Sequence, residues 1–107
     1  MSKVTNEERL IGYLFQNWNS FSEREGVFDL NFTSGRNYIN RLEDKLNIEF
    51  TREWEITADG GGRYYRYTVP DRLTAEKLIK YANFKAGARG VLAFDEQAAE
   101  NILARFN

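Results

Sequence analysis

Apolar residues recur along the chain in helical and strand periods, and these periods divide it into short elements. Near the N-terminus the helical spacing is carried by Leu10, Ile11, Leu14, Phe15 and Trp18. Thr5 precedes them, and Glu8 stands three residues after Thr5, which is the pattern of a capping box. The pattern therefore predicts a first helix that begins after Thr5 and ends within Asn17–Ser20.

The middle of the chain alternates between extended and helical patterns. The polar segment Phe21–Gly26 predicts a loop, and Val27–Phe32 predicts a short strand. Thr33 or Ser34 can cap a second helix over Ser34–Leu46. The buried stripe of that helix is expected to consist of Tyr38, Ile39, Leu42 and Leu46.

A β-hairpin is predicted next. Glu49–Thr57 alternates apolar and polar residues, and Arg63–Val69 returns with three tyrosines. The glycines of Asp59–Gly62 accept the positive φ angles that a tight turn requires. Pro70 ends the second strand because it has no N–H to donate. We expect both tryptophans, Trp18 and Trp54, to anchor the core.

Two further helices are predicted at the C-terminal end. Asp71 or Thr74 can cap the first, which ends at Ala86–Gly90. Its apolar face is expected to be Leu73, Leu78, Ile79 and Ala82. Val91–Phe94 predicts a short extended segment, and Asp95 can cap a last helix. The side chains of that helix that are expected to face the core are Ala98, Ile102, Leu103 and Phe106. The order helix, short strand, helix, hairpin, helix, helix predicts an α+β fold, and a chain of 107 residues predicts one domain over residues 1–107.

Composition narrows the chemistry. The chain contains neither Cys nor His, which removes the thiolate nucleophile, the commonest general base and the usual zinc ligands. We therefore expect no enzyme activity, no metal and no cofactor. The apolar stretches are short and Met1–Thr5 does not form a secretory signal, so a cytoplasmic protein without membrane contact is expected.

One stretch suggests a function. In Asn40–Pro70, NRLEDKLNIEFTREWEITADGGGRYYRYTVP, a helix leads into a glycine-tipped hairpin. This stretch resembles the recognition helix and wing of winged helix-turn-helix domains, including small phage and prophage DNA-binding regulators. The resemblance implies a phage-type transcriptional regulator that binds double-stranded DNA and often acts as a dimer. The sequence departs from the family where the extended Val27–Phe32 replaces the helix before the recognition helix.

The residue types of this stretch suit a DNA interface. Arg and Asn side chains read base edges in the major groove. The exposed face of the second helix is expected to show Arg36, Asn37, Asn40, Arg41 and Asp44. The candidates for base contacts on this face are Arg36, Asn37, Asn40 and Arg41, with Lys45 at its flank. Candidate phosphate ligands are Arg52, Arg63 and Arg66, together with Thr33 and Ser34. Residues 33–69 nevertheless carry six basic and six acidic side chains, so a basic surface depends on which face each side chain takes.

Three alternatives stay open. The near-neutral charge, −1 over the chain, also fits a protein-interaction module, such as a phage-encoded inhibitor or accessory factor of a host protein. The tyrosines of Arg63–Val69 can stack on single-stranded bases, although aromatic residues of a sheet more often belong to the core. The last helix can form a homodimer contact or simply close the monomer core.

Overall fold

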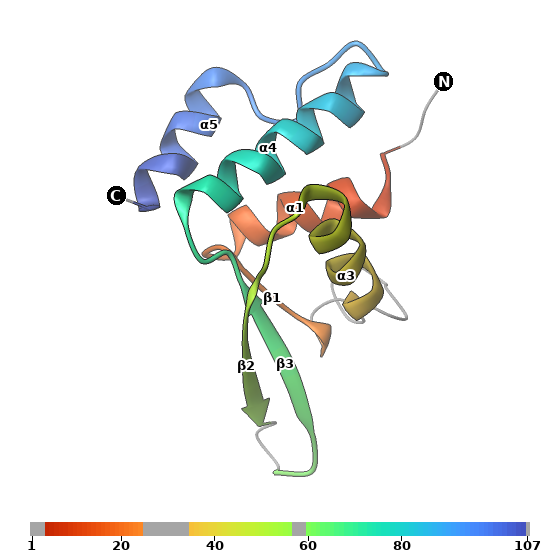
Figure 1. Ribbon diagram of the computed structural model, residues 1–107, viewed down its shortest axis with the longest axis vertical. Coiled ribbons are helices and arrows are strands. Elements are labelled where there is room, and N and C mark those ends of the chain that lie inside the picture. The colour runs from red at the N-terminus through yellow and green to blue at the C-terminus, as the bar shows by residue number, and fades with distance from the viewer. Residues whose placement is uncertain (1–3, 25–34, 57–59, 107) are drawn as a thin grey trace.

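The computed structural model describes residues 4–24, 35–56 and 60–106. In these ranges the chain forms α1 (Asn6–Gln16), β1 (Ser20–Ser22), α3 (Gly35–Leu46), β2 (Thr51–Ile56), β3 (Arg63–Thr68), α4 (Arg72–Gly87) and α5 (Glu96–Leu103), followed by a 3-10 turn, η1 (Ala104–Phe106). The fold is α+β with a winged-helix-like order of elements, as the sequence predicts (Figure 1). The predicted strand Val27–Phe32 and the candidate caps Thr33 and Ser34 lie outside the described residues.

The capping box of α1 is confirmed. The Thr5 hydroxyl accepts a hydrogen bond from the Glu8 N–H at 3.2 Å, and the Glu8 carboxylate accepts one from the Thr5 N–H at 3.2 Å. The prediction for Trp18 is wrong, because this side chain is 84% exposed. The helix ends at Gln16, and Trp18 and Asn19 adopt positive φ angles of 55° and 67°. The chain thus leaves the helical path before the position at which Trp18 would have turned inward.

The segment predicted as a loop, Phe21–Gly26, begins instead with a strand. β1 pairs antiparallel with β3, and its central Phe21, opposite Tyr67, is completely buried. The two residues that follow, Glu23 and Arg24, are helical. A three-residue strand with one apolar side chain is too short to show a period of two, so the pattern of polar residues was misleading here.

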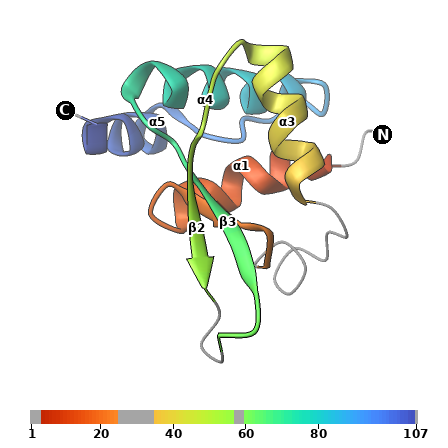
Figure 2. The same cartoon turned by 60° about the horizontal axis from the view of Figure 1, so that its bottom comes forward.

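The three strands form an antiparallel sheet in the order β1-β3-β2. β3 is the central strand, and the β2–β3 hairpin extends well beyond the helices (Figures 1 and 2). The cross-strand pairs of the hairpin include Arg52 with Tyr67, Trp54 with Tyr65 and Ile56 with Arg63. This register decides which side chains of the hairpin share a face.

The two C-terminal helices begin at the predicted aspartates. Asp71 and Asp95 each accept a hydrogen bond at 2.8 Å from the backbone N–H three residues on. Leu73 was predicted to face the core but is 61% exposed. The buried residues of α4 are 74, 75, 78, 79, 82 and 86, and Leu73 lies on the side of the helix opposite the apolar members of this set.

The segment Val91–Phe94 does not form the predicted extended piece. The side chain of Asn83 accepts a hydrogen bond from the Phe94 N–H at 2.8 Å and donates one to the Phe94 carbonyl at 3.0 Å. An amide side chain therefore satisfies the backbone groups that a strand partner would otherwise have paired.

The core is centred on α1. Figures 1 and 2 show α4 and α5 covering one side of α1, with α3 and the sheet on the other. Each of these elements contributes buried side chains, among them Leu10, Leu14, Phe21, Ile39, Leu42, Phe50, Tyr67, Leu78 and Ile102. In α5, Ile102 is buried, Leu103 packs on the core in part and Ala98 is half-buried, and Phe106 of η1 also packs on the core in part. None of the helices in the described ranges has the length and apolar character needed to cross a membrane.

Candidate nucleic-acid interface

The exposed side of α3 carries the side chains that were expected to read bases. Ile39 and Leu42 anchor the helix and are completely buried. The side chains of Arg36, Asn37, Asn40 and Arg41 are all exposed. These positions are spaced i, i+1, i+4 and i+5, so they form one stripe along the helix. α3 begins beside the hairpin and runs back toward α4, which places its first turn nearest the wing (Figure 2).

Arg36 connects this stripe to the wing. Its Nε lies 2.9 Å from Oε1 of Glu23, and its guanidinium carbon lies 5.6 Å from the centre of the Tyr65 ring. The hydroxyl of Tyr67 donates to the same carboxylate oxygen at 2.9 Å. The hydrogen bond to Glu23 raises the pKa of Arg36, so the guanidinium stays positively charged. The first turn of α3 and the central strand are thus tied through one carboxylate.

Arg41 lies farther along α3 on the same stripe. Its guanidinium carbon is 5.6 Å from the centre of the Tyr38 ring. Tyr38 itself accepts a hydrogen bond at 2.8 Å from the side-chain amide of Asn6 in α1. The ring that lies beneath Arg41 is therefore fixed to the first helix, and the guanidinium stays on the solvent side.

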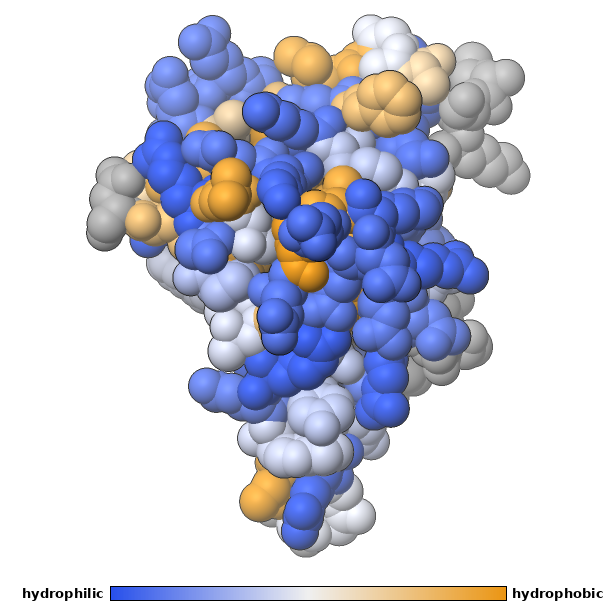
Figure 3. Space-filling model, in the orientation of Figure 1, coloured by the Kyte–Doolittle hydropathy of each residue, from blue (hydrophilic) through white to orange (hydrophobic). Residues whose placement is uncertain are grey.

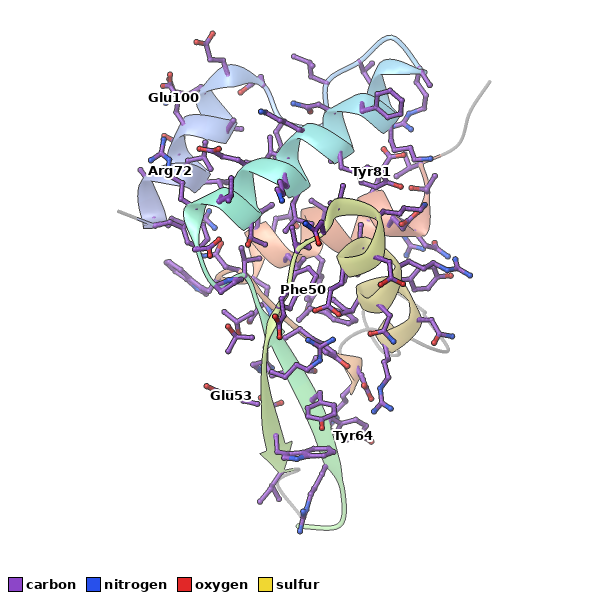
Figure 4. The ribbon with its side chains drawn as sticks, viewed as in Figure 1. Phe50, Glu53, Tyr64, Arg72, Tyr81 and Glu100 are labelled. Atoms are coloured by element: carbon purple, nitrogen blue, oxygen red, sulfur yellow. The ribbon has the colours of Figure 1, made fainter. Side chains whose placement is uncertain are left out.

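The structure does not bring Lys45 to this stripe. Its ammonium lies 3.1 Å from a carboxylate oxygen of Glu7 and donates to the Tyr81 hydroxyl at 3.2 Å. Both partners belong to other helices, α1 and α4, and Figure 4 shows Tyr81 on the side of α4 that faces α1 and α3. The position of Lys45 at the end of α3 thus serves the packing of three helices.

Two arginines predicted to hold phosphates are paired with carboxylates. Arg52 makes a two-point contact with Glu43 at 2.6 and 2.8 Å, and Arg66 makes one with Glu55 at 2.6 and 3.3 Å. Arg66 also donates to the Ser20 hydroxyl at 2.9 Å. The hydrogen bond from Arg66 lowers the pKa of Glu55. Burial favours the neutral form of Glu43, but hydrogen bonds from Arg52 and the Phe50 N–H outweigh it and lower its pKa.

Arg63 is the remaining predicted phosphate ligand. It is exposed at the start of β3, just after the glycine cluster and opposite Ile56. With the residues that the structure describes, its side chain forms neither a hydrogen bond nor an ion pair. Its charge is therefore available to a ligand at the outer part of the wing.

The register separates charge between the two faces of the hairpin. One face carries Arg52, Trp54, Ile56, Arg63, Tyr65 and Tyr67, and the other carries Thr51, Glu53, Glu55, Tyr64, Arg66 and Thr68. The carboxylates of the two strands thus share one face, and Glu53 projects from the hairpin away from α3 (Figure 4). The face with arginines and aromatic rings adjoins α3 through the Arg36–Tyr65 contact. We use the name α3–wing face for a combined surface. It consists of the exposed stripe of α3 (Arg36, Asn37, Asn40 and Arg41) and the hairpin face that carries Arg52, Trp54, Ile56, Arg63, Tyr65 and Tyr67.

Trp54 is the part of this surface that the sequence reasoning missed. It was predicted as a core anchor but is 56% exposed, and its ring stacks on Tyr65 with centroids 4.0 Å apart and planes 19° apart. The helices cover only the inner part of the sheet, where Phe21 and Tyr67 lie. Figure 3 shows pale and apolar side chains beside hydrophilic ones over the outer hairpin, where Ile56 is 65% exposed.

Comparison with known proteins places the chain in a family. A model of the family described as "Uncharacterised protein PM1773" matches residues 11–107. The chain is 38% identical over 72 residues to "Uncharacterized protein PM1773" of Pasteurella multocida (strain Pm70). The matched segment covers 67% of this chain and 51% of that relative, so it spans about half of the relative's length. No solved structure matches the chain. Because the family model matches nearly the whole sequence, the chain belongs to the family described as Uncharacterised protein PM1773.

Proposed function

We propose that this chain is a DNA-binding protein that holds duplex DNA against the α3–wing face. The observation that carries the proposal is the separation of charge by strand register. A net charge of −1 argues against a polyanionic ligand, yet Glu53 and Glu55 lie on the far face of the hairpin. The face that adjoins α3 has arginines and aromatic rings in its two strands and no carboxylate among their described residues.

The proposal assigns each side chain a type of contact. The α3 stripe reads base edges, because arginine pairs with guanine O6 and N7 and asparagine with adenine N6 and N7. Arg63 contacts the phosphate backbone or the minor groove beside the wing. Arg52 contributes less, because Glu43 already neutralises it. By its resemblance to small phage regulators, we propose that the protein regulates transcription and resides in the cytoplasm.

A protein partner is the second candidate function, and the ion pairs favour it. Four of the predicted DNA-binding cations are paired with carboxylates, namely Arg36, Lys45, Arg52 and Arg66. The last turns of α4 expose Phe84, at 77%, and the connection between α4 and α5 exposes Val91 and Leu92, at 53% and 64%. A protein interface with an apolar centre can use such a patch, and it does not depend on free cations.

The two candidates differ in salt dependence. A fluorescent random duplex is titrated at 50 mM and at 200 mM salt while its anisotropy is measured. If Arg63 neutralises a phosphate, log K should fall against log[salt] with a slope of about −0.9, and each further phosphate that an arginine of this face neutralises should add about −0.9. Absence of binding at 50 mM salt would contradict the proposal and direct the search to a protein partner.

Point variants locate the interface. Arg41→Ala should weaken binding by roughly 1–3 kcal/mol and relax base preference, whereas Arg63→Ala should weaken all duplexes about equally. Lys80→Ala is the matched control, because it removes one exposed positive charge from α4, on the side of the molecule away from the wing (Figure 1). If Arg41→Ala and Arg63→Ala bind like the Lys80→Ala control, DNA does not bind to the α3–wing face.

A further inference from the structure

We propose that Trp54 is a stacking platform for an unpaired base in the DNA that contacts the wing. This inference rests on the proposed DNA-binding function and adds a class of preferred ligand to it. Trp54 is more than half exposed although it is a large aromatic residue, and it belongs to β2, which among the described strands is an edge strand paired with β3 alone. One face of the indole meets Tyr65, and the side toward the sheet edge has no neighbouring strand among the described elements.

The platform is held by a continuous series of rings. Trp54 stacks on Tyr65, Tyr65 lies 6.0 Å from Tyr67, and Tyr67 stacks on Phe21 at 6.5 Å. Phe21 and Tyr67 are buried in the core, so the series runs from the interior of the protein to the exposed wing. A ligand that stacks on Trp54 therefore finds a ring that is already ordered, which lowers the entropic cost of binding.

The surroundings of the indole indicate the charge of its ligand. Arg36 lies over Tyr65, and Arg63 stands opposite Ile56, the next residue of β2 on the same face. An aromatic pair alone could also accept a cation, but the two arginines oppose one. A planar group attached to an anion fits both the ring and the arginines. A nucleobase with its phosphate has this combination.

The base must be unpaired for this contact. Within an intact duplex both faces of a base are covered by its neighbours, so an indole can reach a face only where a base is extruded, bulged or terminal. Base–aromatic stacking typically changes affinity by about tenfold or more for one base. We therefore expect a preference for duplexes with an extruded base over fully paired duplexes of the same sequence.

The two tryptophans of the chain allow a direct test. Trp18→Phe leaves Trp54 as the sole indole, and Trp54→Phe leaves Trp18. Each variant is titrated with three duplexes: fully paired, with one extra unpaired thymine, and with an abasic residue at the thymine position. The abasic duplex keeps the backbone distortion and lacks only the base. Binding is followed by anisotropy of the labelled DNA and by tryptophan fluorescence.

The expected result has three parts. In Trp18→Phe the bulged duplex quenches the Trp54 fluorescence and binds about tenfold or more tightly than the paired and abasic duplexes. Trp54→Phe keeps part of this preference without quenching. Trp54→Leu loses the preference and binds the bulged, paired and abasic duplexes with equal affinity, with circular dichroism confirming its fold.

Two outcomes would overturn the inference, and they differ in what they imply. Equal affinity for all three duplexes, with no quenching in Trp18→Phe, would reject the stacking platform and leave the proposed function intact. Absence of binding to every duplex at 50 mM salt would reject both.

Discussion

The hydroxyl of Tyr67 links the wing to the first turn of α3, and its removal should lower stability by a predictable amount. The side chain is 1% exposed and donates to Oε1 of Glu23, the oxygen that also accepts from Arg36. A hydrogen bond to a charged group contributes roughly 1.5–3 kcal/mol. Glu23 keeps Arg36 after the change Tyr67→Phe, so we expect a loss near the lower limit, about 1.5 kcal/mol at pH 8, measured by urea unfolding with circular dichroism.

The same hydroxyl predicts an alkaline pH dependence. Burial and the adjacent Glu23 raise the pKa of Tyr67 to about 12, whereas an unfolded tyrosine titrates near 10. The folded state therefore binds this proton more tightly, and the associated stability is present below pH 10 and lost as pH rises through 12. At pH 11 wild type should have lost about 1.4 kcal/mol that the phenylalanine variant cannot lose. The difference between the two proteins should therefore narrow to roughly 0.1 kcal/mol.

Tyr64→Phe is the matched control, because Tyr64 lies on the opposite face of the same strand and is half-buried. It should match wild type in stability at both pH values. A gap between wild type and Tyr67→Phe that stays the same at pH 8 and pH 11 would refute the raised pKa. A gap near zero at pH 8 would refute the hydrogen bond to Glu23, and with it the proposed tie between the wing and α3.

Three further changes test other parts of the structure. Glu8→Gln keeps an N-terminal cap but loses the charge that receives two hydrogen bonds from Arg89, at 2.6 and 3.0 Å, and that pairing lowers the pKa of Glu8. The variant should melt at a lower temperature than wild type at pH 7. The difference should narrow as pH falls below the ordinary pKa of a glutamate, and it should disappear once the native carboxylate, whose pKa is lowered, is also protonated. Asp71→Ala removes the cap of α4 and should cost about 1 kcal/mol in urea unfolding. Gly35→Ala would place a methyl group 2.7 Å from Cζ of the buried Phe21, so urea unfolding should show a loss of about 1–3 kcal/mol, and an unchanged midpoint would contradict the close packing of α3 on β1.

The elements that local chemistry determines could be read from the sequence. The capping residues Thr5, Asp71 and Asp95 stand where their helices begin, because a cap acts on the backbone within three residues of itself. The hairpin could also be read, since alternation and a glycine turn are local signals. β1 could not, because only its pairing with β3 distinguishes Ser20–Ser22 from a loop.

The prediction that both tryptophans are buried was wrong for a related reason. The alternation of β2 places Trp54 on the face that turns toward the core, but it does not show how far the helices extend along the hairpin. Trp54 lies beyond them and remains exposed. Trp18 shows the same limit at a helix end, where the positive φ angle changes the direction of the chain.

The residue types of the candidate site could be predicted from the sequence. Which of its basic side chains are left without a carboxylate partner could be predicted only in part. The exposed stripe of α3 follows from helical periodicity alone. The ion pairs do not, because Lys45 and Glu7 are 38 positions apart, and Arg36 and Glu23 are 13 apart. Ion pairs between such distant positions form when packing brings a carboxylate beside a basic side chain. Local sequence patterns therefore do not show which basic side chains will be paired.

Strand register decides on which face of the hairpin each charged side chain lies, which the sequence alone left open. Residues 33–69 carry equal numbers of basic and acidic side chains, but Glu53 and Glu55 alternate with Arg52, Trp54 and Ile56 along β2. Because side chains alternate with a period of two, the carboxylates share one face and the other group shares the opposite face. A slip of one residue in the pairing would exchange the two groups and place the carboxylates beside Arg36. The buried Tyr67 and Phe21 oppose such a slip, since it would move a core side chain into solvent. The packing that fixes the fold thus also decides which charged side chains of the hairpin lie on the surface that we propose meets DNA.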